Sequence, residues 1–276
     1  MTGTSPPAGW YADPFGRHEA RYYNGTTWTD HVTSHGRPGT DPPGGASHVP
    51  TVQRAPEKVQ RDVQRAGQAG VAEFQGGGSL FSEPILVVNQ KAKLIEISNE
   101  YAIYDQNARQ IAAVREVGQS GLKKAARLLT SYDQFFTHKL QIVDMNGMPL
   151  LTLTRPAKVI KSRIIVQDPA GGEVGAIVQQ NVFGKIRFAL ESGGATIGSI
   201  NAENWRAWNF SIRDHTETEV ARVTKTWEGL AKTMFTTADN YVVQMHRPLQ
   251  GALQALVIAS ALSIDTALKQ DKRGFN

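Results

Sequence analysis

The sequence contains no cysteine among its 276 residues. This absence excludes disulfide bonds, thiolate metal sites, cysteine nucleophiles and palmitoylation. The first residues, MTGTSPPAGW, also lack the basic segment and the apolar segment of a secretory signal. We therefore expect a cytoplasmic protein that folds without covalent cross-links.

Sequence motifs of common enzyme classes are missing as well. The seven histidines are scattered and form no HExxH pair. The chain has neither a GxSxG nucleophile elbow nor a Walker phosphate loop. The Gly-rich stretch GQAGVAEFQGGGS follows no predicted strand and opens no predicted helix, so it is typical of a linker. The sequence predicts a protein that is not an enzyme and that holds no cofactor and no metal.

Long apolar runs are scarce, and the longest is LQGALQALVIASALSIDTAL, residues 249–268. The uncharged stretch that overlaps this run, 248–264, has 17 residues and would form about 25 Å of helix, whereas a bilayer core of about 30 Å usually needs about 20 residues. Gln250 and Gln254 would be costly in hydrocarbon. Apolar residues surround the whole helix, which is typical of burial on all sides. Of two interpretations, a membrane anchor and a buried core helix over 249–270, these features favour the core helix.

Composition divides the chain into three parts. Residues 7–35 are rich in Trp and Tyr and predict a small aromatic β module. Residues 36–80 are poor in large apolar residues and rich in Gly, Pro and Gln, which is typical of a flexible linker. Residues 81–276 form the folded body, and they hold 23 Lys and Arg against 18 Asp and Glu. The positive charge therefore lies on the body, where it is compatible with an anionic partner surface.

The body repeats one pattern, in which an apolar strand, an acidic residue, a turn and a second apolar strand follow each other. The acidic residues are Asp105, Asp144, Asp168, Glu191 and Asp214. Asp, Asn and Gly supply local hydrogen bonds and positive φ angles, so each copy predicts a β-hairpin. The long first interval contains GLKKAARLLTSYDQFF, whose first part predicts a short helix.

With PILVVNQ or KLIEIS before them and YVVQMH after them, the hairpins predict about 12 antiparallel strands. A meander of this length should close on itself to hide its edges. Side chains alone fill a barrel of about eight strands, and more strands leave a lumen. A helix with its side chains, about 10 Å across, fits such a lumen. The sequence therefore predicts a mainly β fold, a closed antiparallel barrel around a buried C-terminal α-helix, preceded by the aromatic β module.

Residues 224–244, TKTWEGLAKTMFTTADNYVVQ, resemble the phospholipid scramblase family. The positions that match the family's pattern are Lys225, Trp227, Gly229, Leu230, Phe235, Thr236, Ala238, Asp239 and Asn240. The general pattern extends over residues 81–270. The family is grouped with the Tubby and LURP-one proteins, which implies a barrel around a central C-terminal helix. The resemblance also implies lipid scrambling. A buried helix leaves no segment to line a polar path through a bilayer, so we expect lipid binding instead.

The family's pattern includes a calcium loop with several carboxylates. Here Thr237 and Gln250 stand where that loop has Asp, and Asp239 and Asn240 remain as side-chain ligands. Calcium takes about six to eight oxygen ligands. We therefore predict a polar turn without a tight calcium site.

Strand alternation places basic side chains on the outer face of the predicted barrel. Lys161 and Arg163 alternate with small or apolar residues along 157–167, and Lys185 and Arg187 point outward on the next unit. Arg offers phosphate a planar donor fork, and Lys offers a point charge. If the two rows lie side by side, we expect Lys161, Arg163, Lys185 and Arg187 to bind lipid headgroups, as Tubby relatives bind phosphoinositides. The alternative is an ordinary solvated face.

Residues 7–33 are similar to a short bacterial module of unknown function. The matching residues are Gly9-Trp10-Tyr11, Asp13-Pro14, Gly16, Arg21-Tyr22, Gly25 and Trp28-Thr29. The segment also loosely resembles a WW domain, in which exposed aromatic residues bind Pro-rich peptides. Two interpretations stay open. The aromatic residues form the module's own core, or Trp10, Tyr23 and Trp28 bind a protein partner or a membrane interface.

These patterns predict a scramblase-related protein that binds anionic phospholipid, or a lipid-like ligand, peripherally at the inner face of the plasma membrane. The alternative is a scaffold that recruits a protein partner through residues 7–33. We expect no nucleic acid, because no basic helix is present and the stacking aromatics cluster in the N-terminal module. The oligomeric state does not follow from the sequence.

Overall fold

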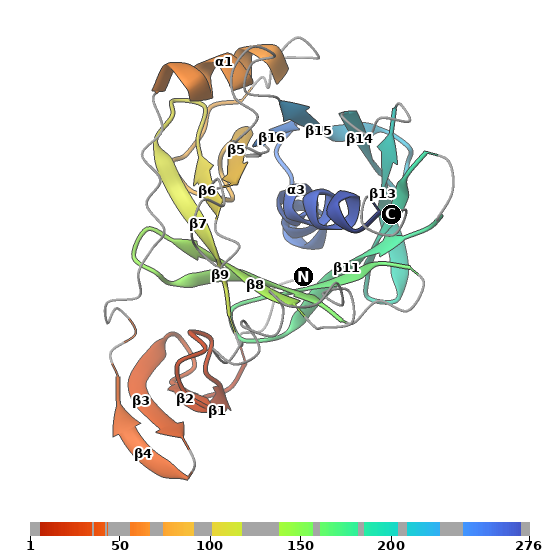
Figure 1. Ribbon diagram of the computed structural model, residues 1–276. Helices are drawn as coiled ribbons and strands as arrows, with labels where there is room; N and C mark the ends of the chain where they lie inside the picture. The colour runs from red at the N-terminus through yellow and green to blue at the C-terminus, as the bar shows by residue number, and fades with distance from the viewer. Residues whose placement is uncertain are drawn as a thin grey trace.

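The computed structural model describes residues 6–34, 36–41, 43, 56–66, 74–90, 101–117, 138–156, 161–181, 185–203, 209–226 and 240–271. In these ranges the chain forms a small N-terminal sheet, a closed barrel, a helix outside the barrel and a helix within it (Figure 1). The mainly β class, the closed antiparallel barrel and the enclosed helix are confirmed. The predicted helix in GLKKAARLLTSYDQFF, the segment KLIEIS and the scramblase-like residues 227–239 lie outside the described residues.

Twelve strands close the barrel in the order β10-β11-β12-β13-β14-β15-β16-β5-β6-β7-β8-β9. Every pairing is antiparallel, and β16 joins β5 to bring the two ends of the barrel sequence together. The strands are β5 (Ile85–Gln90), β6 (Tyr101–Tyr104), β7 (Gln110–Glu116), β8 (His138–Asp144), β9 (Pro149–Arg155), β10 (Arg163–Gln167), β11 (Glu173–Gln179), β12 (Arg187–Ser192), β13 (Ala195–Ala202), β14 (Asn209–Asp214), β15 (Glu219–Thr226) and β16 (Asn240–Met245).

Four of the five repeated acidic residues build the same tight turn. The side chain of each Asp accepts hydrogen bonds from backbone N–H groups two or four residues later, at Asp105, Asp144, Asp168 and Asp214. The third residue after each Asp has a positive φ angle, at Ala108, Gly147, Gly171 and Glu217. The strand register also shifts beside each turn, as in a hairpin closed by a bulge.

Glu191 differs from the other four. Gly193 and Gly194, both at positive φ, form its turn, and Ser192 pairs directly with Ala195. This is the two-residue hairpin loop that needs positive φ at both positions. The Glu191 carboxylate is therefore not used in the turn, and it contacts Arg163 instead.

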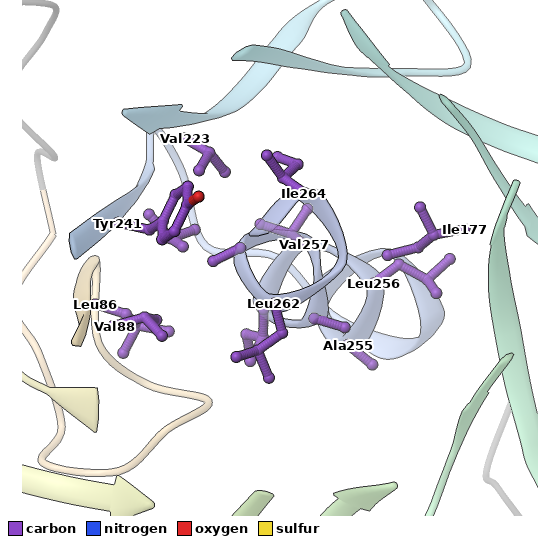
Figure 2. Packing of buried hydrophobic residues seen from close by; sticks show 14 of the residues in the cluster. Leu86, Val88, Ile177, Val223, Tyr241, Ala255, Leu256, Val257, Leu262 and Ile264 are labelled. Carbon is purple, nitrogen blue, oxygen red and sulfur yellow. The ribbon is translucent and has the colours of Figure 1, made fainter. Parts of the chain in front are cut away.

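Helix α3 (Gly251–Asp271) runs through the lumen of the barrel. Its apolar side chains pack on inward-facing residues from opposite walls, among them Val88, Ile177 and Tyr241 (Figure 2). Ser260 and Ser263 donate to helix carbonyls at 2.6 and 2.9 Å, so their buried hydroxyls are satisfied. The interpretation of this segment as a core helix is confirmed.

None of the helices in the described ranges combines the length and the apolar composition that a membrane crossing requires.

Helix α1 (Pro56–Ala66) lies within the range predicted as linker and packs on the outside of the barrel. Its Val59 joins an apolar cluster with outward-facing residues of β5, β6 and β16, namely Ile85, Val87, Ala102, Tyr104 and Val242. Asn240 Nδ2 donates to Asp62 Oδ2 at 3.3 Å, and Asn89 Nδ2 donates to Asn240 Oδ1. Apolar contacts and hydrogen bonds thus seat α1 on this part of the wall.

The last residues of the range predicted as linker also pack against the barrel. Phe74 contacts the main core, and Leu80 is buried in it. The buried Glu83 carboxylate accepts a hydrogen bond from the Gly78 N–H at 2.6 Å. Gly78 has a positive φ angle, which glycine adopts without strain.

The N-terminal module is a four-stranded antiparallel sheet of β1 (Gly9–Ala12), β2 (Ala20–Tyr23), β3 (Trp28–Ser34) and β4 (Arg37–Thr40). Because β4 follows residue 35, the sheet takes in the first part of the predicted linker. Phe15, Tyr23 and Trp28 form the apolar core on one side of this sheet. Trp10 and Tyr22 pair across β1 and β2 on the other side, with ring centroids 5.5 Å apart.

Candidate functional site

The predicted lipid-binding residues lie on the outer wall, where β10 begins, β11 ends and β12 begins. Arg163 of β10 is in register with Val178 of β11, which is in register with Ala189 of β12. Arg187 lies two residues before Ala189, so it points to the same face as Arg163. Two strand spacings separate β10 from β12, which is about 10 Å. The structure therefore brings the two predicted rows side by side.

Hydrogen bonds link Lys161, the end of β11 and the residues that lead into β12. Lys161 Nζ donates to the Gln180 carbonyl at 2.8 Å, and the Gln180 N–H donates to the Arg187 carbonyl at 2.8 Å. Asn181 Nδ2 donates to the Lys185 carbonyl at 2.6 Å, and its Oδ1 accepts from the Arg187 N–H at 2.9 Å. We call Lys161, Lys185 and Arg187 the basic corner. Sequence reasoning missed Asn181, although Asn between two strand patterns is a turn signal.

The four predicted cations differ in how far acidic groups compensate them. Arg163 Nη1 lies 3.1 Å from Glu191 Oε2, and its Nη2 lies 3.8 Å from Glu173 Oε1. Within the part of the chain that the structure describes, the exposed side chains of Lys185 and Arg187 contact no carboxylate. The uncompensated positive charge therefore lies at the basic corner, and Arg163 is its partly neutralised neighbour.

A hollow of about 210 Å³ lies beside Arg163, and its lining residues are Arg163, Glu173, Glu191, Ser192, Gly193, Gly194, Ala195 and Thr196. Two carboxylates and one guanidinium line it, so its net charge disfavours phosphate. Gly193 and Gly194, which form the turn between β12 and β13, also line the hollow. An anion is therefore better placed at the basic corner than in this hollow.

Arg222 on β15 shows a fully compensated cation for contrast. Its guanidinium contacts Glu203 at 2.7 Å and Glu219 at 2.8 Å. Burial lowers its pKa, but the hydrogen bond that Arg222 donates to Glu203 and the charge of Glu219 outweigh burial and leave the pKa raised. A phosphate at Arg222 would have to displace two carboxylates, which the basic corner does not require.

The predicted partner-binding residues of the N-terminal module are divided between core and surface. Tyr23 and Trp28 are buried, with ring centroids 5.1 Å apart. Trp10 is 50% exposed and lies edge-on to Tyr22. Of the three predicted residues, Trp10 therefore lies at the surface, whereas Tyr23 and Trp28 belong to the module's core.

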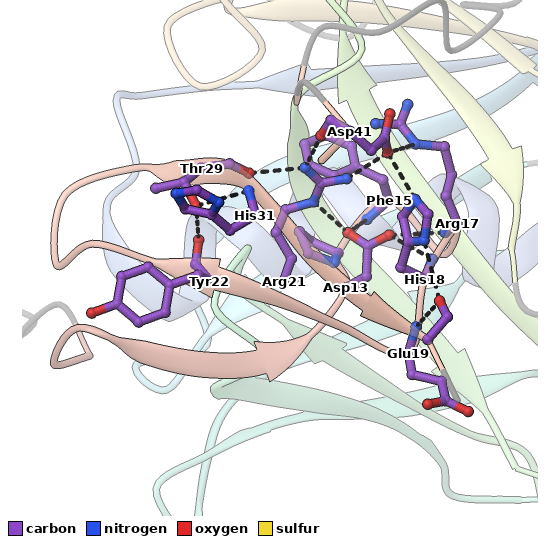
Figure 3. A network of polar contacts seen from close by, with 12 residues as sticks. Asp13, Phe15, Arg17, His18, Glu19, Arg21, Tyr22, Thr29, His31 and Asp41 are labelled. Atoms are coloured by element: carbon purple, nitrogen blue, oxygen red, sulfur yellow. Dashed lines mark hydrogen bonds and ion pairs between the residues drawn. The ribbon is translucent and has the colours of Figure 1, made fainter. Parts of the chain in front are cut away.

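A buried ionic network organises the loops of the module (Figure 3). Arg21 Nε donates to Asp13 Oδ1 at 2.8 Å, and its Nη2 donates to Asp41 Oδ2 at 2.7 Å. Both guanidinium groups lie near the Phe15 ring, that of Arg21 at 4.7 Å and that of Arg17 at 4.9 Å from the ring centroid. Burial opposes ionisation of Asp41, but Arg21 and Arg17 outweigh it and hold the pKa of Asp41 below its ordinary value. Asp13 and Arg21, two residues of the module's signature, are therefore structural.

Of the two oxygen ligands left from the calcium loop, Asn240 is buried beneath α1 and bonded to Asp62 and Asn89. Asp239 lies outside the described residues. Across the ranges that the structure describes, no three His, Asp or Glu side chains are grouped to hold a metal ion.

Comparisons with known proteins cover both parts of the chain. The family described as Scramblase matches residues 76–268, and the family described as Protein of unknown function (DUF2510) matches residues 8–45. The chain is 24% identical over 182 residues to a phospholipid scramblase family protein of Schizosaccharomyces pombe, covering 60% of this chain and 47% of that protein. It is 22% identical over 202 residues to Altered inheritance rate of mitochondria protein 25 of Saccharomyces cerevisiae, covering 60% of this chain and 59% of that protein. The chain thus spans about half the length of these curated relatives. No solved structure matches it at a significant level.

Proposed function

The chain belongs to the Scramblase family, and we propose that it binds anionic phospholipid at a membrane surface through the outer wall of its barrel. The observation that carries this proposal is the basic corner, where Lys161, Lys185 and Arg187 lie together. Arg presents a donor fork to a phosphate, and the two lysines add point charges. Anionic lipids are enriched in the cytoplasmic leaflet, so we place the proposed contact at the inner face of the plasma membrane.

Surface binding is favoured over lipid movement across the membrane by the position of α3. Its residues Leu256 to Ile264 are buried within the barrel, so this helix is not available to line a path for headgroups. Each cation near an anionic surface contributes about 1 kcal/mol. The basic corner and Arg163 therefore support weak, reversible binding that falls as salt rises.

Vesicle co-sedimentation tests the proposal with a charge-matched pair of double variants. Lys185→Glu with Arg187→Glu should reduce binding to phosphatidylserine-containing vesicles at least about tenfold. Lys58→Glu with Arg61→Glu, on the exposed side of α1, changes the net charge equally and should leave binding close to that of the unsubstituted chain. Equal losses in both variants, or equal binding to vesicles of phosphatidylcholine alone, would contradict the proposed site.

A second function, recruitment of a protein partner by the N-terminal module, is favoured by the exposed Trp10 and its neighbour Tyr22. Exposed aromatic pairs of this kind are suited to extended Pro-rich peptides. In a pull-down with the full chain, Trp10→Ala should remove a captured partner and leave vesicle binding unchanged. Unchanged capture by Trp10→Ala would exclude this face.

A further inference from the structure

The outer wall of β7 to β9 contacts the N-terminal module. Met148, in the turn between β8 and β9, packs against the module's aromatic core of Phe15, Tyr23 and Trp28. Gln141 Nε2, on β8, donates to the carbonyl of Pro14. Figure 1 shows the module beside these strands. The Gln141–Pro14 bond joins residues 127 positions apart, so it is tertiary and not imposed by chain connectivity.

The side chain of Gln141 bonds the barrel with one end of its amide group and the module with the other. It points away from the lumen, because its neighbours Leu140 and Ile142 belong to the inner core, yet it is 1% exposed. Its Oε1 accepts two hydrogen bonds from Arg115, from Nε at 3.1 Å and from Nη2 at 2.7 Å. Its Nε2 would lose its protein partner if the module left.

Charged groups of the module also act on Arg115 of β7. Burial lowers the pKa of Arg115, the positive charge of Arg17 lowers it further, and the negative charge of Asp13 raises it in part. Met148 supplies the apolar half of the contact, since a thioether packs well against aromatic rings. The same module loop, residues 13–17, thus contributes the carbonyl that binds Gln141, one ring of the aromatic cluster against which Met148 packs, and the two charges that act on Arg115.

We propose that the N-terminal module stays docked on the barrel of its own chain, and that Gln141 on β8 and Met148 in the β8–β9 turn form the surface that binds it. The proposal gives the module a role that does not depend on lipid binding by the basic corner. Residues 44–55 connect the module to α1, and α1 is itself seated on the barrel. Docking of the module is therefore an intramolecular event, which favours it over association of two separate chains. A small contact is therefore enough to keep the module docked.

The absence of cysteine allows a direct distance measurement on the full chain. Thr26→Cys in the module and His215→Cys in the β14–β15 turn provide two exposed positions for nitroxide labels. Double electron–electron resonance should give a narrow distribution of the distance between the labels at residues 26 and 215 in the chain that carries no other substitution. Met148→Asp should broaden it, because a carboxylate would enter the aromatic core. Met145→Asp is the matched control, since Met145 lies in the same turn but is 40% exposed, and its distribution should stay narrow.

Gln141→Glu separates docking from the stability of the wall. Glutamate keeps the acceptor for Arg115 and loses the donor to Pro14, so the barrel should melt normally while the distribution broadens. This variant decides the question if Met148→Asp unfolds the barrel. A broad distribution in the unsubstituted chain, or a narrow one in Gln141→Glu, would overturn the proposal.

Discussion

The outer wall of the barrel has two unlike halves. On the covered half, which we define as β16 and β5 to β8, most of the large outward-facing side chains are buried, whether apolar, at Ile85, Val87, Tyr104, Val143 and Val242, or polar, at Gln141, while Lys139 is exposed. On the open half, which we define as β10 to β14, large outward-facing side chains are exposed or half-exposed, at Arg163, Ile165, Val178, Arg187, Asn201 and Arg213. Both halves follow the same strand alternation. What differs is the N-terminal region, because α1 and the module contact the first half.

The difference shows that an alternating strand sets which residues face outward but not which of them meet water. On the covered half the outward positions extend the hydrophobic core, where each square ångström of buried apolar area contributes about 25 cal/mol. On the open half the large outward positions are solvated, and the charge of Arg187 contacts no carboxylate of the described residues. One barrel thereby has a structural side and a side suited to recognition.

The largest expected effect comes from placing one charge on each half. Val87→Asp puts a carboxylate beneath α1, where it has no partner, and should lower the free energy of unfolding by about 3–5 kcal/mol. Val178→Asp places the same charge at a half-exposed outward position of β11 and should cost less than about 1 kcal/mol. Urea denaturation of both variants measures the difference. Similar losses at the two positions would remove the distinction between the halves.

Acid should affect the covered half through the module. The folded-state pKa of Asp41 lies below its unfolded value, so its ionised form stabilises the module above about pH 4 and this contribution is lost as the pH falls through the folded pKa. The protection factors for amide hydrogen exchange of residues 9–40 should therefore fall below about pH 4. Asp41→Asn should remove this dependence, whereas Asp30→Asn, at an exposed carboxylate, should keep it. An unchanged acid response in Asp41→Asn would place its origin elsewhere.

The smallest expected effect compares two equivalent turns. Glu217, next to the open half, has a φ angle of 62°, so Glu217→Gly should relieve about 1 kcal/mol of strain. Ala108 has a φ angle of 65° but also packs against the cluster beneath α1. Ala108→Gly should gain little, because the lost methyl contact offsets about 0.8 kcal/mol of the relief. Thermal unfolding of both variants would show the difference, and equal gains would argue against packing at Ala108.

Local patterns in the sequence were enough to predict the barrel. The Asp turns at Asp105, Asp144, Asp168 and Asp214 depend on side-chain hydrogen bonds within five residues, so they can be read from short segments. The enclosed helix followed from its all-round apolar surface and from the size of the lumen. Alternation also placed Arg163 and Arg187 on one outer face.

The covered half could not be predicted in the same way. Gln141 resembles any outward polar residue of an alternating strand, and its partner Pro14 is 127 positions away. In α1, Val59 and Val63 carry the apolar contact with the wall, and two valines are a weak signal in a Gly- and Pro-rich segment. The pairing of Arg163 with Glu191 was missed for the same reason, since Glu191 was assigned to a turn by its position in the repeat.

The central claim is that the open half, next to the basic corner, is the face that meets an anionic membrane. A single environment-sensitive fluorophore tests it, placed either at Asn201→Cys, in register with Arg187, or at Gln60→Cys on the exposed side of α1. On addition of phosphatidylserine-containing vesicles, we expect the emission of the label at residue 201 to shift to the blue and that of the label at residue 60 to stay unchanged. A shift at residue 60 with none at residue 201 would contradict the claim.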